Sequence, residues 1–396
     1  MQAFTYYAPT EIIFGANSEN KTADMIKKYG GTRVMLVYGK GSVEKSGLLG
    51  KITSQLDAAG IPYAKHGGAA PNPHLSYARD GVKSAIDFGA DFFLGMGGGS
   101  AIDAAKAIAH GARNPETDIW KFWLREAPLT KSYPIGVILT ISAAGSETSS
   151  ASVLTNMDTG QKRGFGSDLN RPVFAIMNPE LTYSLPKNQL ACGIADIMMH
   201  TMDRYFGPEI NEGKTNELTD EIAEALLRTV IRNGPKILEN PKDYDAQSEI
   251  MWSGSLSHTG LTGLGRTPDF SVHGLGHELS ALFDVPHGES LTAMWGTWAE
   301  YVLDENPGRF ARYAEKVWGA TGNAREAAAE GIRRTVEFFK SIDMPTCFSE
   351  MNIGIQPDEV LQKMAAGAVY DGRRLVGSFK PLDKDGCYEV YKAANI

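Results

Sequence analysis

The first part of the chain alternates short apolar runs with longer amphipathic segments. Between the apolar runs, the segments at residues 76–88 and 100–110 have helical periodicity, with Ile102, Ala105 and Ile108 on one face. The runs are rich in β-branched and aromatic residues and predict buried strands at residues 33–38, 91–96, 134–139 and 172–177. Strands that alternate with helices predict a parallel sheet with helices on both faces.

After Pro186 the strand pattern gives way to helical periodicity. Helices are predicted at residues 190–206, 216–233, 246–258, 273–282, 289–302, 324–342 and 357–366. The expected breaks between them are Gly213, Gly234-Pro235, Pro268, Pro286 and Pro345. The pattern therefore predicts a Rossmann-like α/β domain over residues 1–185 and an all-α domain over residues 186–396.

Composition and charge narrow the class of protein. The net charge of −8 argues against nucleic-acid binding, which needs a basic surface. The three cysteines form no CxxC pair, and their odd number favours free thiols in a reducing compartment. The chain has no signal-peptide pattern at its start and no apolar run of about 18 residues, so we expect a cytoplasmic protein that does not enter a membrane.

A glycine-rich loop, GMGGGS at residues 95–100, joins a predicted strand to a predicted helix. Glycines let a backbone approach a pyrophosphate closely, and a helix N-terminus offers free amides and a partial positive charge. Ser100 is the expected N-cap, with Asp103 in the first turn. The loop lacks both the third glycine of a GxGxxG fingerprint and the GK[ST] of a P-loop. It indicates a phosphate site of unidentified ligand, or a turn that only connects two elements.

A second polar segment, TISAAGSETS at residues 140–149, follows the next predicted strand. Small hydroxyl side chains at the carboxyl end of a parallel strand suit the lining of a ligand crevice. An ordinary polar turn explains this segment equally well.

Five of the eight histidines fall between residues 200 and 287. Asp196 and His200 are four residues apart on a predicted helix and share a face, as do His273 and His277, while His287 lies in a predicted turn. A carboxylate with three imidazoles suits Fe(II) or Zn(II) better than Mg²⁺ or Ca²⁺. Each histidine alone is more often a core or surface residue. The combined spacing favours a metal site, although it does not say which three or four side chains ligate.

These residues resemble the iron-containing, or group III, alcohol dehydrogenases over nearly the whole chain. The likeness includes the PT-x-IIFG pattern at residues 9–15, PNP at 71–73, GGGSAIDAAK at 97–106, GSE at 145–147, and the metal-type spacings. The chain is similar in particular to the subgroup of butanol dehydrogenases and NADPH-dependent aldehyde reductases. The resemblance implies a dehydroquinate synthase-like fold, in which a dinucleotide-binding domain precedes a helical metal domain and catalysis occurs in the cleft between them.

The resemblance also implies roles for individual residues. Asp196, His200, His273 and His287 would hold the metal, Fe(II) in most members and Zn(II) in some, and His277 would lie near the nicotinamide. The residues implied for the cofactor groove are Asn72, Gly97, Gly98, Gly99, Ser100, Asp103, Thr140, Ser142, Ser149 and Lys162. The family's usual TTAGTGSE reads TISAAGSE at residues 140–147, which puts individual hydroxyl contacts there in doubt.

The choice of nicotinamide cofactor follows from the end of the first predicted strand. NAD sites commonly place an acidic residue there to hold the adenosine ribose. Here Gly39, Lys40 and Ser42 follow the strand without a carboxylate and offer room and donors for a 2′-phosphate. We therefore expect NADP(H) in preference to NAD(H), with a plain turn and a solvated Lys40 as the alternative.

The expected reaction is hydride transfer between NAD(P)H and a short to medium aliphatic alcohol or aldehyde, such as butanol or butanal. His277 is the expected proton relay, with an uncoordinated cleft histidine or a fifth ligand as alternatives. A dehydroquinate synthase-like lyase is disfavoured because the helical half lacks clustered Lys and Arg. A glycerol dehydrogenase-like zinc enzyme and a non-catalytic nucleotide or metal sensor remain as alternatives. By analogy with relatives, residues 4–14 pair between subunits of a homodimer.

Overall fold

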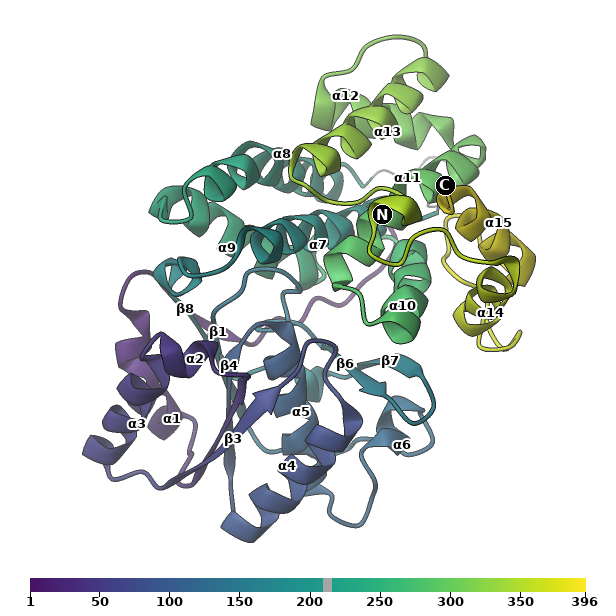
Figure 1. Ribbon diagram of the computed structural model, residues 1–396. Coiled ribbons are helices and arrows are strands. Elements are labelled where there is room, and N and C mark those ends of the chain that lie inside the picture. The colour runs from purple at the N-terminus through teal and green to yellow at the C-terminus, as the bar shows by residue number, and fades with distance from the viewer. Residues whose placement is uncertain (209–215) are drawn as a thin grey trace. The chain divides into compact units, whose positions relative to one another are not determined.

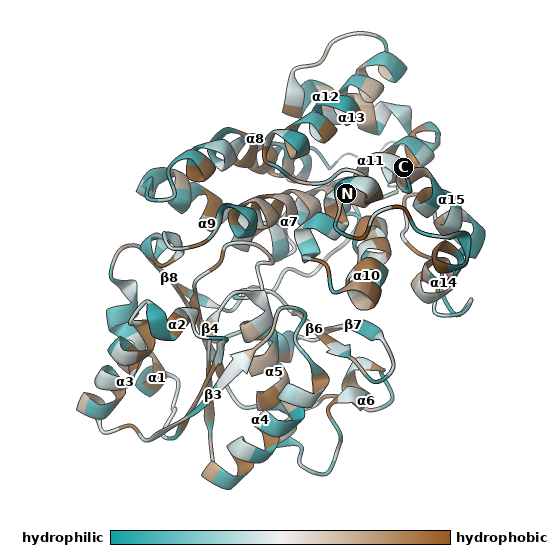
Figure 2. Cartoon of the chain, viewed as in Figure 1, coloured by the Kyte–Doolittle hydropathy of each residue, from teal (hydrophilic) through white to brown (hydrophobic). Residues whose placement is uncertain are grey.

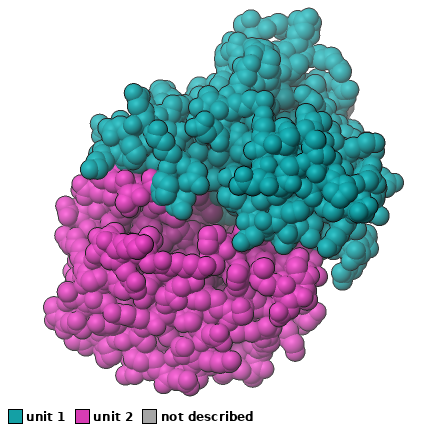
Figure 3. Space-filling model, in the orientation of Figure 1, with its two compact units in different colours: residues 1–6, 186–396 teal, residues 7–185 magenta. Residues whose placement is uncertain are grey.

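The computed structural model describes residues 1–208 and 216–396, so the predicted break at Gly213 lies outside the described residues. The chain forms two compact units, residues 7–185 and residues 1–6 together with 186–396 (Figures 1 and 3). No helix of the described residues has the length and apolar character needed to cross a membrane.

The unit of residues 7–185 is built on a six-stranded parallel sheet in the order β1-β8-β5-β4-β2-β3, which confirms the predicted α/β class. Its strands, with the hairpin strands β6 and β7, are β1 (Glu11–Phe14), β2 (Val34–Gly39), β3 (Tyr63–Ala69), β4 (Phe92–Gly97), β5 (Ile135–Leu139), β6 (Ala151–Asn156), β7 (Gln161–Gly166) and β8 (Phe174–Met177). Its helices are α1 (Thr22–Lys28), α2 (Ser42–Lys45), α3 (Leu48–Ala59), α4 (Leu75–Phe88), α5 (Gly99–Arg113) and α6 (Trp120–Trp123).

Both faces of the central strands are buried. Side chains alternate along a strand, so Leu36 of β2 and Leu94 of β4 join a core with Ile52 of α3. On the other face, α5 approaches β4 so closely that a Cβ on Gly95 would lie 3.2 Å from the Cβ of Ala105. Burial on both faces explains why these strands read as continuous apolar runs. Figure 2 colours such hydrophobic residues brown.

Two parts of this unit were not predicted as strands. The edge strand β3 has the sequence YAKHGGA, whose polar residues and two glycines hide any apolar alternation. Strands β6 and β7 form a separate antiparallel hairpin. Both elements have partly exposed faces, so burial does not demand an apolar run in them.

The sheet has a topological switch point between β2 and β4, because β3 is added on one side of β2 and β4 on the other. The chain leaves β2 to form β3 on one side and returns to form β4 on the other, with Tyr38 paired to Met96 at the carboxyl ends. In open parallel sheets, ligands bind outside the carboxyl ends of the strands at such a switch point. Gly39 and Gly97, the last residues of β2 and β4, therefore mark the expected place for a ligand in this unit.

The other unit is helical, as predicted. Its helices are α7 (Lys187–Tyr205), α8 (Glu217–Glu239), α9 (Tyr244–His258), α10 (Ser271–Phe283), α11 (His287–Val302), α12 (Pro307–Trp318), α13 (Ala324–Ser341), α14 (Asp358–Ala368) and α15 (Lys384–Ala394). All seven predicted helices are present, and α12 and α15 are additional. Helix α7 is buried along most of its length and packs against α8, α9, α10 and α11.

The predicted helix break at Gly234-Pro235 is wrong, because α8 continues through Pro235 to Glu239. A Cβ on Gly234 would lie 3.1 Å from the Cδ1 of Ile194, so the glycine permits close contact between α8 and α7. Ile237 is fully buried one turn further along. Tertiary packing on both sides of the proline thus outweighs its local preference to end the helix.

Candidate metal and cofactor sites

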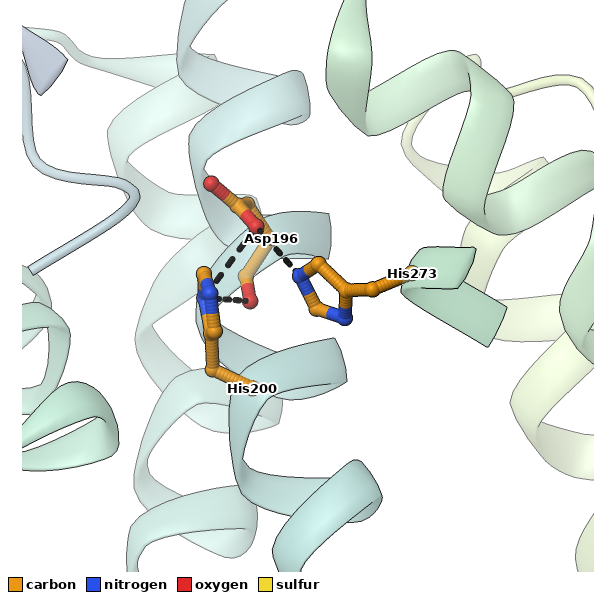
Figure 4. Close-up of side chains that lie close together, drawn as sticks. All are labelled: Asp196, His200 and His273. Carbon is orange, nitrogen blue, oxygen red and sulfur yellow. Dashed lines mark hydrogen bonds and ion pairs between the residues drawn. The ribbon is translucent and has the colours of Figure 1, made fainter. Parts of the chain in front are cut away.

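Helix α7 places Asp196 and His200 one turn apart, as predicted. Both side chains are buried, and His200 Nδ1 lies 3.2 Å from Asp196 Oδ1 and 3.0 Å from the Asp196 carbonyl oxygen (Figure 4). Because α7 is packed on its neighbours along most of its length, both side chains are largely shielded from water.

Helices α10 and α11 bring further imidazoles to the same carboxylate. Nε2 of His273 lies 3.6 Å from Asp196 Oδ1, and Nε2 of His287 lies 3.9 Å from it. Asp196, His200 and His273 form one buried group whose donor atoms lie within 4.8 Å of one another. His287 is the first residue of α11, after the N-cap Pro286, and so is helical rather than in the predicted turn.

The electrostatics of the cluster favour a negative charge at its centre. Burial opposes ionisation of Asp196, but the histidines around it outweigh burial and hold its pKa well below the usual value. Burial likewise opposes protonation of His273, whereas the carboxylates of Asp203 and Asp196 raise its pKa to about 9. The site is therefore organised to hold positive charge beside the Asp196 carboxylate.

The donor set fits a divalent metal ion. Oδ1 of Asp196 and Nε2 of His273 are buried and have no hydrogen-bond partner in the part of the chain that the structure describes. Buried polar atoms of this kind indicate a bound ligand. Donor atoms bound to one tetrahedral ion at 2.0–2.2 Å lie roughly 3.3–3.6 Å apart. The distances of 3.6 and 3.9 Å from Asp196 Oδ1 to Nε2 of His273 and Nε2 of His287 fall within a few tenths of an ångström of that range. Nδ1 of His200 lies 3.0 Å from the Asp196 carbonyl oxygen, so Nε2 is the nitrogen of His200 that is left for a metal.

Two other histidines lie at the edge of this cluster. The ring centroid of His277 is 6.4 Å from that of His273 and 5.6 Å from that of His287. His258, at the end of α9, has its ring centroid 4.1 Å from that of His200. It was not among the residues predicted for the metal site. Burial, His200 and Arg204 together keep the pKa of His258 well below its usual value.

In the α/β unit, the glycine loop lies at the carboxyl end of β4 as predicted. Gly97 has φ +152°, and Gly98 is the N-cap of α5, so the predicted N-cap Ser100 instead lies inside the first turn. A Cβ on Gly98 would lie 3.0 Å from the Cβ of Ile141. The loop is thus packed directly against the segment that follows β5, and an added side chain would fill the space between them.

Asp103 lies in the interior of this unit. Its Oδ1 accepts a hydrogen bond from Ser146 Oγ at 2.5 Å, and its Oδ2 accepts one from the Val153 amide at 2.8 Å. Lys106, also on α5 and fully buried, donates to the carbonyl oxygens of Ser146 and Ala151 at 2.8 and 2.7 Å and to Ser146 Oγ at 2.7 Å. This network ties α5 to the segment between β5 and β6.

The polar segment after β5 contributes one unsatisfied group. Ser142 is buried, and its Oγ has no hydrogen-bond partner among the described residues. Ser149 Oγ instead contacts the backbone of Ala151, and the amide of Thr140 donates to Gly97 O at 3.0 Å. Ile141 and Ala144, on either side of Ser142 in sequence, face Gly98 and Gly99 at the N-terminus of α5. A buried hydroxyl in this segment suits a polar ligand such as a nucleotide phosphate.

The remaining predicted cofactor residues lie near the carboxyl ends of β2 and β3. Lys162 Nζ donates to Asn72 Oδ1 at 2.9 Å, which joins β7 to the turn after β3. Gly39 ends β2, and Lys40 and Ser42 are exposed beyond it. Sequence reasoning overlooked Glu44, whose Oε1 accepts a hydrogen bond from Tyr38 Oη at 3.1 Å.

Comparisons with known proteins cover almost the whole chain. Residues 9–179 match the model of the iron-containing alcohol dehydrogenases, and residues 190–395 match that of the C-terminal domain of the Fe-containing alcohol dehydrogenase family. NADH-dependent butanol dehydrogenase A of Clostridium acetobutylicum is 38% identical over 99% of both chains. NADPH-dependent aldehyde reductase YqhD of Escherichia coli is 32% identical over 100% of both. The crystal structure of NADH-dependent butanol dehydrogenase A from Thermotoga maritima has a TM-score of 0.95 at 31% identity and covers 100% of this chain and 99% of that one.

Proposed function

Because the chain belongs to the family of iron-containing alcohol dehydrogenases, we propose that it transfers a hydride between NADP(H) and a short to medium aliphatic alcohol or aldehyde, such as butanol or butanal. Membership of the family makes it a dehydrogenase or reductase that acts on CH–OH groups. The named relatives include butanol dehydrogenases and an aldehyde reductase, which supports a small alcohol or aldehyde as substrate.

The observation that carries this proposal is the buried carboxylate of Asp196 with three imidazoles around it. Asp196, His200, His273 and His287 would hold the metal, with Fe(II) as the first choice and Zn(II) as the second. A divalent ion supplies Lewis acidity, which polarises a carbonyl and lowers the pKa of an alcohol. A sensor would need the same ligands, but the match of both halves of the chain to dehydrogenases favours catalysis.

In this proposal His277 moves the proton that accompanies hydride transfer. Its ring centroid lies 5.6 Å from that of His287 and 6.4 Å from that of His273. It is partly exposed, and imidazole exchanges protons near neutral pH, so it is suited to pass a proton to water.

The proposed cofactor site uses the carboxyl edge of the parallel sheet. Gly97, Gly98 and the first turn of α5 would bind the pyrophosphate, with Ser142 Oγ as a further donor. Lys40 and Ser42 would bind the 2′-phosphate of NADP(H). The relatives' names include both NADH-dependent and NADPH-dependent enzymes, so the preference rests on these side chains.

We also propose that the protein is a homodimer. Phe4, Tyr6 and Tyr7 near the N-terminus are 49%, 42% and 50% exposed, an unusual concentration of aromatic surface. Strand β1 pairs with β8 inside the chain and leaves its other edge unpaired among the described residues. Light scattering that gives a mass near 42.9 kDa, the mass of one chain, at micromolar concentration would exclude the dimer.

The test of the function is anaerobic oxidation of NADPH by the protein with butanal as substrate. Metal-stripped protein is compared with protein to which Fe(II) or Zn(II) has been returned, and NADH is the parallel donor. The proposal expects activity that returns with metal and a higher kcat/KM for NADPH. An equal or higher kcat/KM for NADH would refute the cofactor preference. Absence of turnover with every metal and donor would refute the reaction and favour a lyase or a sensor.

A further inference from the structure

Two consecutive residues of α7 contact two different histidines of the metal cluster. Oδ2 of Asp203 lies 2.5 Å from Nδ1 of His273, and the guanidinium of Arg204 lies 2.8 Å from Nδ1 of His258. Both contacts are made one turn after His200, by side chains that are only 1% and 8% exposed. Neither residue belongs to the set of proposed metal ligands.

The two contacts place the ring protons on opposite nitrogens. An ionised carboxylate only accepts hydrogen bonds, so Nδ1 of His273 carries a proton and Nε2 is the nitrogen left to bind a metal. That Nε2 is the atom that faces Asp196 Oδ1 at 3.6 Å, and it makes no hydrogen bond with any residue in the described ranges. A guanidinium only donates, so Nδ1 of His258 accepts and its proton lies on Nε2.

We propose that Asp203 and Arg204 are positioning residues that select the metal's ligands by fixing these opposite tautomers. This inference rests on the proposed metal site. Asp203 orients His273 and presents its Nε2 lone pair to the metal. Arg204 donates a hydrogen bond to Nδ1 of His258, which occupies its lone pair and leaves an N–H on the other nitrogen. This histidine is therefore not a ligand, although its ring centroid lies 4.1 Å from that of His200.

The surroundings hold both positioning residues in place. Arg204 also donates to the His200 carbonyl oxygen at 2.8 Å, and its guanidinium lies 4.8 Å from the ring centroid of Phe270. Arginine side chains are not deprotonated in proteins, so the guanidinium donates to His258 and does not accept. The carbonyl oxygen of Asp203 accepts a hydrogen bond from the Asp269 amide at 2.7 Å, which anchors the segment before α10 beside it.

The first test measures zinc affinity by competition with a chromophoric chelator on the full-length, metal-stripped protein. Removal of a carboxylate that orients a ligating histidine costs 10–100-fold in metal affinity in known sites. We expect that loss for Asp203→Ala and a smaller one for Asp203→Asn, which keeps an acceptor oxygen. Asp245→Asn on the exposed start of α9 is the matched control and should bind zinc like the parent. Unchanged affinity in Asp203→Ala would overturn the role of Asp203.

His258→Phe tests the excluded histidine, because it keeps an aromatic ring against His200 and removes both nitrogens. Zinc affinity should change less than threefold, whereas a tenfold loss would make His258 a ligand and overturn the proposal. Long-range ¹H–¹⁵N correlation spectra of the zinc-loaded protein should show the proton of His258 on Nε2 and that of His273 on Nδ1. The reverse assignment for either ring would also overturn it. None of these measurements uses turnover, so an inactive protein that passes them would refute the proposed function alone.

Discussion

Replacement of the buried Lys106 by methionine tests the network behind the glycine loop. Methionine is close to lysine in length and shape but has no ammonium group. The change removes three hydrogen bonds, to two atoms of Ser146 and to the Ala151 carbonyl oxygen, and leaves Asp103 without the positive charge 3.7 Å from its Oδ1. Burial lowers the pKa of Lys106 to about 8, whereas the carboxylates of Asp103 and Glu147 raise it and limit the shift. The ammonium group is therefore charged at pH 7.

The expected loss of stability follows from these contacts. Breaking a buried ion pair by removing one partner costs about 3–5 kcal/mol, because the other charge stays buried. Ser146 Oγ and the Val153 amide still donate to Asp103, which limits the loss. We therefore expect a loss of about 4 kcal/mol for Lys106→Met, or a fall of ~8–16 °C in Tm for a unit of this size. In Lys106→Met/Asp103→Asn the stranded charge is absent, so this double variant should recover about half of the loss.

The assay is urea unfolding at pH 7, followed by circular dichroism and repeated by differential scanning calorimetry. Lys83→Met is the matched control, because Lys83 lies on α4 with its side chain 77% exposed in an ion pair of 3.6 Å with Asp80. It should change stability by less than about 0.5 kcal/mol. A loss below about 1 kcal/mol for Lys106→Met, or a double variant less stable than the single one, would refute the reasoning.

Three further predictions concern catalysis, cofactor binding and pH. His277→Ala should lower kcat by about 10²–10⁴-fold and leave the metal content unchanged by elemental analysis, whereas loss of metal would make His277 a ligand. Ser142→Ala should weaken NADPH binding about 3–10-fold in a fluorescence titration without lowering Tm, since the Oγ of Ser142 has no partner to lose within residues 1–208 and 216–396. Burial lowers the pKa of His110 to about 4. The unfolded chain therefore takes up this proton first, and stability should fall by at most about 1.4 kcal/mol per pH unit between pH 6.5 and 4. His110→Asn should flatten that part of the stability curve, and an unchanged curve would contradict the assignment.

The elements that can be predicted from sequence are those in which every consecutive residue is buried. Strands β2, β4, β5 and β8 are covered on both faces and must be apolar throughout, so their sequences identify them. Strand β3 has only one neighbour, and its Lys65 and His66 need no apolar cover. Pro235 is a case in which the local sequence misleads. A proline usually ends a helix, but here the contacts of α8 with α7, which lies far away in sequence, keep the helix intact.

The candidate site residues also fall into those that the sequence could group and those that it could not. Asp196 and His200 could be grouped because both lie on one helix face, and the spacing of His273 and His287 added to that pattern. The network of Asp103, Lys106 and Ser146 could not be inferred, because its members are joined across 40 residues by the packing of α5 on the segment after β5.

The spacing of the five clustered histidines does not tell which of them bind the metal. An imidazole is a ligand only if the nitrogen that faces the metal has its lone pair, and the partner of the other nitrogen decides that. For His273 and His258 those partners are Asp203 and Arg204, adjacent in sequence but opposite in charge. A pattern of histidines therefore predicts where a metal binds, whereas the donors and acceptors packed behind the rings decide which of the histidines hold it.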